Sequence, residues 1–286
     1  MFFGKKPSVG LDLGSHSVKT ASYGKKGLEG CSSASTVEEL KVSGNVVATI
    51  PGHGTIGRYL EFPVLSAKEL AVAGPAQAWQ FIPYEQDQTN LSFLQVPPMG
   101  GDKKTALFFV ADQKERVSEG QALLKGLKVQ RMEVPALALA REFAADHPSE
   151  EFQALVHCGH TLTHLLIMKG RHPYYYREIR LGGKDFTYAF QQANQSTWEE
   201  AESYKHGTDA MAREVGVEPF LQRWLKEVKR SLAGSQIDVA RVFLSGGSAA
   251  WKGLRERLSS DLELEVITDE PALYKVAAGL VREEAR

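Results

Sequence analysis

The residues best suited to chemistry lie in one short segment near the N-terminus, GLDLGSHSVK. Gly14 lets the backbone approach an anion closely, and the amides of a tight turn point inward at that anion. Ser15 and Ser17 add hydroxyl donors, and Lys19 adds a positive charge. Asp12 could hold the waters of a Mg²⁺ ion that bridges phosphates, since Mg²⁺ usually keeps several waters. The segment indicates a phosphate-binding hairpin, although an ordinary hairpin with a capped turn has the same pattern.

A second Gly-rich segment, FLSGGSAAWKGL, lies near the C-terminus. An apolar strand opens there into Gly246, Gly247 and Ser248, and a helical pattern follows. Backbone without side chains at a helix N-terminus suits a nucleotide packed against it. A Gly-Gly turn between a strand and a helix is common, so a plain tight connection remains the alternative for this segment.

The N-terminal hairpin has a counterpart in the middle of the chain. Two pairs of apolar segments read as strands joined by a glycine turn, namely Val9–Leu13 with Ser17–Tyr23 and Ala154–Cys158 with Leu162–Met168. Aligning VGLDLGSHSVKT with ALVHCGHTLTHL matches Asp12 with His157 and Gly14 with Gly159, and both offsets (157 − 12 and 159 − 14) are 145. Two like hairpins half a chain apart predict two similar lobes that face each other across a cleft.

The remaining segments alternate between strand and helix patterns. Strands are expected at 106–111, 129–134 and 239–244, and helices at 113–124, 136–145, 198–205, 219–232, 251–258 and 273–282. This alternation predicts mixed α/β sheets with helices outside. Residues 51–105 are punctuated by prolines and predict a small inserted subdomain. Gly74-Pro75 falls inside the helical pattern there, which predicts a kink or two short helices.

The chain has 286 residues, of which 43% are hydrophobic and 24% charged, and its net charge is −1. That composition is typical of a globular protein, and the length approaches the limit of one compact core, which favours two lobes. The balanced charge gives no indication of a nucleic-acid partner. Cys31 and Cys158 are too few for a disulfide framework and fit a reducing compartment. No apolar stretch has the roughly 18 residues of a membrane span or forms a signal peptide, so a cytoplasmic location is expected.

The ordered set of hairpin, twin hairpin and SGGS turn resembles the superfamily of actin, Hsp70 and sugar kinases. WEEAESYK is similar to a helix that, in the FtsA and PilM families, offers Glu and Lys to adenosine; the matching positions are Glu202 and Lys205. Without the other motifs, an i,i+3 ion pair on a solvated face would be preferred. Further segments resemble PilM proteins in kind and order. The consecutive ones are GRYLEFPVLSAKEL, WQFIPYEQDQTNLSF and FFVADQKERVSEGQALLKGLKVQRMEVPALALAREF, and the later ones are REIRLGGKDFT and LYKVAAGLVREE. FtsA proteins usually end in an amphipathic membrane-binding helix, and VREEAR at residues 281–286 is not one, which favours the PilM family.

The resemblance to the PilM family covers almost the whole chain and implies an actin-like (ribonuclease H-like) α/β fold. It implies two lobes and an inserted FtsA/PilM-type subdomain, divided as 7–50 and 106–148 for the first lobe, 51–105 for the subdomain, 149–265 for the second lobe, and 266–286 for a segment returning to the first. Gly24–Thr49 is too short for the helices usual there, so the first lobe is expected to be trimmed.

The resemblance also implies ATP with Mg²⁺ in the cleft. The residues expected to bind the nucleotide are Asp12, Gly14, Ser15, Ser17, Lys19, Gly159, Glu202, Lys205, Gly246, Gly247 and Ser248, with Asp12 holding the metal through water. His157, however, stands where the superfamily usually has an aspartate, and a neutral imidazole supplies no charge to the metal shell. Hydrolysis is therefore expected to be weak or lost. Nucleotide binding is either kept through the backbone amides and Lys19 or lost as well, which would leave a pseudo-ATPase.

Two classes of function remain open at this point. The resemblance implies a scaffold of type IV pilus or related secretion assembly, attached peripherally to the inner membrane through the cytoplasmic N-terminal tail of a PilN-like protein and contacting other assembly proteins. The alternatives are an active ATPase or small-molecule kinase of the same superfamily, and an FtsA-like cell-division protein. A kinase needs a positioned base, and the motifs place no carboxylate in the cleft besides Asp12, which favours the scaffold.

His157, Cys158, His160 and His164 suggest a zinc site at first sight. Successive strand side chains alternate between faces, however, and Gly159 and His160 occupy the turn. Four convergent ligands are therefore not expected from this segment.

Overall fold

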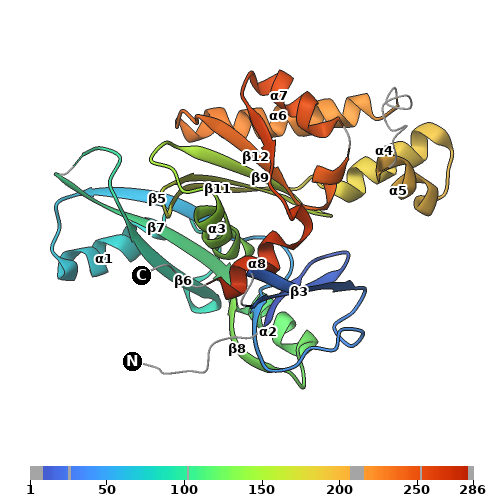
Figure 1. Cartoon of the computed structure of the whole chain (residues 1–286). Coiled ribbons are helices and arrows are strands. Elements are labelled where there is room, and N and C mark those ends of the chain that lie inside the picture. The colour runs from blue at the N-terminus through green and yellow to red at the C-terminus, as the bar shows by residue number, and fades with distance from the viewer. Residues whose placement is uncertain (1–8, 25–26, 102, 207–215, 252, 283–286) are drawn as a thin grey trace.

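The computed structural model describes residues 9–24, 27–101, 103–206, 216–251 and 253–282. The rest of the chain, including the outermost parts of the expected ranges 7–50 and 266–286, lies outside the described residues. Two β-sheets form the framework, and helices pack between and around them (Figure 1). Among the described residues no helix is both long and apolar enough to span a bilayer.

The five-stranded sheet belongs to lobe I, and five strands of the eight-stranded sheet belong to lobe II. Lobe I has the order β3 (Gly27–Ala34), β2 (Val18–Gly24), β1 (Val9–Leu13), β4 (Asn45–Thr49), β8 (Lys128–Glu133). Lobe II has the order β11 (His172–Ile179), β10 (Thr163–Lys169), β9 (Gln153–Cys158), β12 (Arg241–Ser245), β13 (Val266–Thr268). In both lobes the first three strands are antiparallel and the last two pair in parallel. The sequence prediction of two similar lobes is confirmed.

The inserted subdomain extends the sheet of lobe II. It consists of β5 (Ile56–Pro63), α1 (Ala67–Ala78), a short 3-10 turn η1 (Gln86–Gln88), β6 (Thr89–Val96) and β7 (Lys104–Gln113). β5 joins β11 where Arg58 lies opposite Tyr175. Residues 106–111, expected in the second part of lobe I, lie in β7 instead, because β7 pairs along its length with β5 on one side and β6 on the other.

The proline in the inserted subdomain does not divide its helix. α1 is one helix with Pro75 inside it, so the expectation of two short helices is wrong. Ser66 and Glu69 form a reciprocal capping box at its start, which satisfies two orphan backbone donors. Gly74 is buried so close to Leu107 that an added Cβ would lie 2.9 Å from a side-chain methyl. Packing of α1 on β7 therefore outweighs the local cost of the proline.

Two helices lie between the lobes and position the cleft (Figure 1). They are α3 (Pro135–Asp146) and α8 (Lys275–Val281), which follows the 3-10 turn η4 (Ala272–Tyr274). α8 packs on β1, β2 and α3, and a Cβ at Gly10 would lie 2.0 Å from the carbonyl oxygen of Ala277. Only glycine permits so close a helix–strand approach, which fixes the strand that carries Asp12.

The remaining helices are distributed unequally. Lobe II carries α4 (Gly183–Asn194), α5 (Trp198–His206) and α6 (Glu218–Ser235) between β11 and β12, and α7 (Leu254–Leu262) before β13. In lobe I, residues 35–44 join β3 to β4 without a helix, and α2 (Lys114–Leu123) precedes β8. The core of lobe II is built on Trp224, Trp251 and Phe186, each at most 1% exposed.

Candidate functional site

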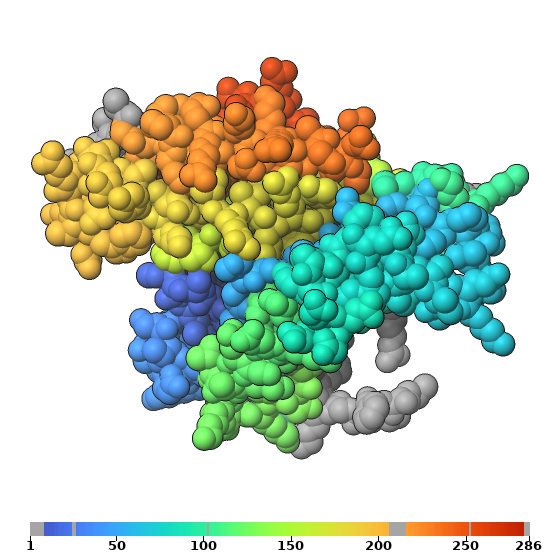
Figure 2. Space-filling model, turned by 180° about the vertical axis from the view of Figure 1, so that it is seen from behind, coloured from blue at the N-terminus to red at the C-terminus, as the bar shows by residue number. Residues whose placement is uncertain are grey.

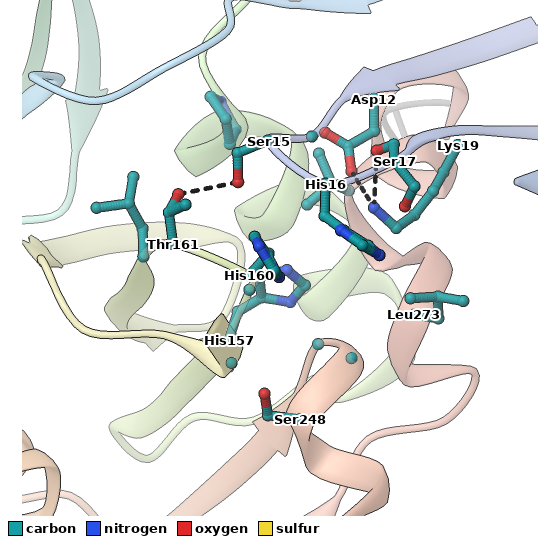
Figure 3. A pocket seen from close by; sticks show the side chains of 18 of the residues that line it. Asp12, Ser15, His16, Ser17, Lys19, His157, His160, Thr161, Ser248 and Leu273 are labelled. Carbon is teal, nitrogen blue, oxygen red and sulfur yellow. Dashed lines mark hydrogen bonds and ion pairs between the residues drawn. The ribbon is translucent and has the colours of Figure 1, made fainter. Parts of the chain in front are cut away.

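One cavity of about 470 Å³ lies between the lobes, a volume typical of small-ligand sites. Both hairpin turns and the turn after β12 line it (Figure 3). One side of α5 lines it as well. All the residues singled out from the sequence lie on its wall: Asp12, Gly14, Ser15, Ser17, Lys19, Gly159, Glu202, Lys205, Gly246, Gly247 and Ser248. Segments far apart in the chain therefore meet around a single space.

Hairpin 1 (β1, β2 and their turn) contributes one anion and one cation. Asp12 and Lys19 are opposite each other in the register, and the ammonium lies 3.7 Å from the Asp12 carboxylate. Lys19 donates to the carbonyl oxygen of Ser17 at 3.2 Å, and the Thr49 hydroxyl lies 3.4 Å from Asp12. The two charged side chains are each 13% exposed, so both are reachable from the cavity.

The hairpin can take part in a Mg²⁺ site only together with other oxygens. Mg²⁺ is usually bound through one or two carboxylates, waters and substrate phosphates, and Asp12 fits the part of one carboxylate. Across the part of the chain that the structure describes, no group of three or more His, Cys, Asp or Glu side chains is placed to hold a metal ion. The oxygens of a bound polyphosphate would have to complete such a shell.

Hairpin 2 (β9, β10 and their turn) places two neutral imidazoles where hairpin 1 has charges. His157 is opposite His164 in the register, so the 145-residue offset that relates Asp12 to His157 also relates Lys19 to His164. The ring centroids are 6.0 Å apart. Burial lowers the pKa of His157 well below its ordinary value and also lowers the pKa of His164. At neutral pH this half of the cleft therefore carries no charge from the pair.

The geometry of hairpin 2 separates the four residues considered for zinc. His157 Nδ1 pairs with the Ser245 hydroxyl at 2.9 Å, and His164 Nδ1 pairs with the Tyr176 hydroxyl at 2.8 Å. Cys158 is buried in the core of lobe II, on the other face of β9, and burial raises the pKa of its thiol. His157 and His164 share the cleft face of the hairpin, but Cys158 lies on the opposite face and His160 in the turn, so the four side chains do not converge.

The two hairpin turns touch each other at the mouth of the cavity. Ser15 Oγ lies 2.9 Å from Thr161 Oγ1, and the rings of His16 and His160 stack with centroids 4.5 Å apart (Figure 3). By the 145-residue offset, Ser15 corresponds to His160 and His16 to Thr161, so the two contacts are related by an approximate two-fold axis. Burial and the neighbouring His16 lower the pKa of His160 to about 4.

The turn after β12 forms the rear wall of the cavity. Gly246 has a φ of 91°, and a Cβ there would lie 2.3 Å from the carbonyl oxygen of Cys158. Its N–H donates to the carbonyl oxygen of Ala272 at 3.0 Å. Only glycine tolerates both the left-handed backbone and this approach to hairpin 2. The 3-10 turn η3 (Gly247–Ala250) then begins directly at the cavity.

The pair on α5 has divided roles. Lys205 is 4% exposed, and its ammonium donates to Glu202 at 3.0 Å, to Thr187 Oγ1 at 2.9 Å and to the carbonyl oxygen of Gly183 at 3.4 Å. All three N–H donors of an ammonium are thereby used within the protein. Lys205 therefore orients Glu202, which is 28% exposed, at the cavity wall.

Several residues on the wall were not assigned to the nucleotide site from the sequence. The hairpin offset could have assigned His160, Thr161 and His164 to it, because they correspond to Ser15, His16 and Lys19. Gly183, Glu270 and Leu273 also line the cavity, and no local motif marks them, since long-range packing brings them there.

A second cavity of about 500 Å³, here called the groove, lies between the inserted subdomain and lobe I. Its walls are residues 90–92 of β6, residues 129–133 of β8, and parts of α2, α3 and β7. Figure 2 shows the cyan inserted segment against the green of α2 and β8 on one face of the molecule. β6 and β8 are both edge strands. The groove thus runs between the unpaired edges of two sheets.

Comparison with known proteins agrees with this architecture. The family model described as "Type IV pilus assembly protein PilM" matches residues 35–284. The chain belongs to the PilM family. The PilM fold is seen in a solved "PilM-PilN type IV pilus biogenesis complex", which matches with a TM-score of 0.80 and 21% identity over 97% of this chain and 98% of that chain.

More distant structures share the same fold. An archaeal actin homologue, Ta0583, matches with a TM-score of 0.54 and 12% identity over 96% of this chain and 98% of its own. The activator of 2-hydroxyisocaproyl-CoA dehydratase from Clostridium difficile, solved with bound ADPNP, matches with a TM-score of 0.50 and 12% identity over 96% and 92% of the two chains. This PilM-family chain therefore has the actin-like α/β fold that its motifs indicate.

Proposed function

We propose that this chain is a nucleotide-binding scaffold of type IV pilus assembly or of a related secretion system. It works in the cytoplasm and associates peripherally with the inner membrane through the tail of a PilN-like protein. The observation that carries the proposal is the convergence of two glycine hairpins and the SGGS turn on one cavity of about 470 Å³. The likeness of this chain to the structure of a PilM-PilN complex supports the choice of partner.

The nucleotide is ATP, and the residues on the cavity wall divide its parts among them. The amides at Gly14 and Gly159 and the ammonium of Lys19 take the phosphates, while the turn at Gly246 packs against the nucleoside and Glu202 accepts hydrogen bonds from it. Asp12 holds Mg²⁺ through water. A structure of the same fold that contains ADPNP supports this assignment.

Hydrolysis is weak or lost. Besides Asp12, the carboxylates on the cavity wall are Glu202 and Glu270. Glu202 pairs with Lys205, and Glu270 accepts the amide N–H of Ala272 at 3.0 Å. A general base must reach the proton that it removes, and these carboxylates are engaged with the protein. His157 adds no charge that could hold a metal-bound water, so binding rather than turnover is the favoured role.

The partner's tail lies in the groove. β6 has no charged residue along TNLSFLQV, and its residues 90–92 line the groove. β8, by contrast, carries Lys128, Arg131 and Glu133, the kind of charges that protect an edge from pairing. An uncharged edge strand offers unpaired backbone groups to an extended peptide. β6 is therefore the strand along which a tail would bind.

A thermal-shift titration with ATP and ADP, each with Mg²⁺ and with EDTA, tests the nucleotide proposal. At a hundredfold excess over Kd, a ligand stabilises the folded state by about 2.7 kcal/mol, a clear rise in Tm. We expect ATP to raise Tm in both buffers. No response to either nucleotide in either buffer would overturn the proposal.

Binding of a fluorescent peptide tests the partner. The probe is the cytoplasmic N-terminal segment of the PilN homologue from the same organism, with a scrambled peptide as control. We expect saturable binding of the tail peptide that Leu91→Asp weakens, which would support the groove as the binding site. Equal binding of the scrambled peptide would count against it.

A further inference from the structure

The cleft and the groove share a wall. Residues 50–55 join β4 to β5, and Ile50 lines both cavities. Gly52 lines the cleft, whereas Asp112, which holds the same segment from β7, lines the groove. A ligand in the cleft or in the groove therefore contacts residues 50–55 or Asp112, which is hydrogen-bonded to them.

Buried side chains from β7 and α2 hold the wall in place. Thr55 donates to Asp112 at 2.7 Å, and Arg116 pairs with the same carboxylate at 2.6 Å. Arg116 also donates to the carbonyl oxygen of Pro51 at 2.9 Å. Thr55, Asp112 and Arg116 are all at most 7% exposed. Burial makes these bonds costly to break, since a group left without its partner loses its hydration as well.

A second set of bonds continues from the wall to hairpin 2. The backbone N–H of Gly54 donates to Glu178 Oε2 at 2.7 Å, and the hydroxyl of Tyr176 donates to Glu178 Oε1 at 3.0 Å. The same hydroxyl lies 2.8 Å from His164 Nδ1. A phenol has one proton, so Tyr176 must accept from the N–H of His164. Donors thus run from hairpin 2 through Tyr176 to Glu178, and the Gly54 N–H of the wall donates to the same carboxylate from the other side.

We propose that the hydrogen-bonded chain His164–Tyr176–Glu178–Gly54 couples the cleft to the groove, so that ligands in the two cavities alter each other's affinity. The inference rests on the proposed binding of nucleotide in the cleft and of a tail in the groove. A ligand that moves hairpin 2 changes the acceptor geometry at Glu178 and with it the position of residues 50–55. Linkage requires the effect to be equal in both directions.

Tyr176→Phe removes the central link and keeps the ring. Tyr174→Phe is the matched control, because Tyr174 lies on the same strand, is also buried, and donates to the carbonyl oxygen of Pro97 at 3.1 Å, outside the chain. Glu178→Gln is the second variant. The Gly54 N–H and the Tyr176 O–H reach different oxygens of the carboxylate, and the amide replaces one of these oxygens with an NH2 donor, so one of the two hydrogen bonds is lost. Circular dichroism of each variant establishes that it is folded.

The experiment is a calorimetric titration of ATP in the absence and presence of saturating tail peptide, using the full chain. Coupling between sites commonly changes affinity about five- to 150-fold. We expect at least a fivefold change in wild type and in Tyr174→Phe. In Tyr176→Phe and Glu178→Gln the change falls below about twofold, while each ligand alone keeps its affinity within about threefold.

Two results would overturn the inference and leave the proposed function standing. One is that both ligands bind the wild-type protein without affecting each other. The other is that both chain variants couple as wild type does. If ATP or the tail does not bind at all, the proposed function fails and the coupling fails with it. The two failures are thus distinguishable from the single-ligand titrations.

Discussion

Lobe I and lobe II carry five strands in the same order, and each presents one glycine hairpin to the cleft. The register is the same as well, with Asp12 opposite Lys19 in one hairpin and His157 opposite His164 in the other. The chemistry is not repeated, because the first pair is ionic and the second is buried and neutral. The backbone of the glycine turn and the charge of the side chains beside it are therefore separable features of this fold.

The lobes also differ in what surrounds the sheet. In the described residues, lobe II has three helices between β11 and β12, where lobe I has only residues 35–44. Lobe I instead gives rise, between β4 and β8, to the inserted subdomain that forms the groove. The lobe with the charged hairpin is thus also the lobe that bounds the proposed partner site.

The largest expected effect comes from removing the cation of hairpin 1. In Lys19→Met, ATP loses a charge-assisted contact worth about 1.5–3 kcal/mol, and Asp12 is left to repel the phosphates. We expect the Kd for ATP to rise roughly 10- to 100-fold by calorimetry. Lys169→Met, at the far end of β10, is the control and should bind like wild type. An unchanged Kd in Lys19→Met would mean that hairpin 1 does not contact the phosphates.

Converting hairpin 2 into the chemistry of hairpin 1 should create a dependence on metal. In His157→Asp a second carboxylate faces the phosphates, so affinity in EDTA falls by about tenfold and recovers with Mg²⁺. His157→Asn is the neutral control and should bind ATP alike in both buffers. Binding by His157→Asp that ignores Mg²⁺ would contradict the comparison.

Hairpin 2 should also make stability depend on pH in a defined window. His160 has a folded pKa of about 4, below the ordinary value of about 6.5, and the pKa of His157 is lowered too. Between these values the unfolded chain binds protons that the folded chain does not, so stability present above pH 6.5 is lost as pH falls toward 4. Melting curves should show this fall, and His160→Asn should reduce it. A flat profile down to that pH would show that the histidines are not protected from protonation.

The contact between the turns should have the smallest effect. The Ser15–Thr161 hydrogen bond is exposed, and such bonds contribute about 1 kcal/mol or less. Ser15→Ala should therefore shift Tm by no more than a few degrees. A fall of roughly ten degrees or more would make this contact a main support of the lobe arrangement.

The parts of the molecule that could be predicted from sequence are those with local signals. Glycine turns between short apolar segments mark both hairpins, and the constant offset between them predicts the repeated lobe. The apolar run at 106–111 also predicts a strand. Its pairing with β5 and β6 could not be predicted, because pairing depends on segments distant in the chain. The helix around Pro75 shows the same limit, since its packing on Leu107 decides the outcome.

The candidate site follows the same division. Every residue inferred from the three motifs lies on one cavity, since each motif brings its own turn geometry. The role of Lys205 was not evident, because its burial against Thr187 and Gly183 depends on α4. Leu273 reaches the wall only through the return of the C-terminal segment from lobe II to lobe I.

Hydrogen-exchange mass spectrometry with and without ATP tests the central claim most directly. A nucleotide held by both hairpins and the rear turn must slow exchange in residues 12–19, 157–164 and 245–250 together. We expect protection in all three segments at the same ATP concentration. Protection of one hairpin alone, with the other two segments unchanged at saturation, would contradict the account.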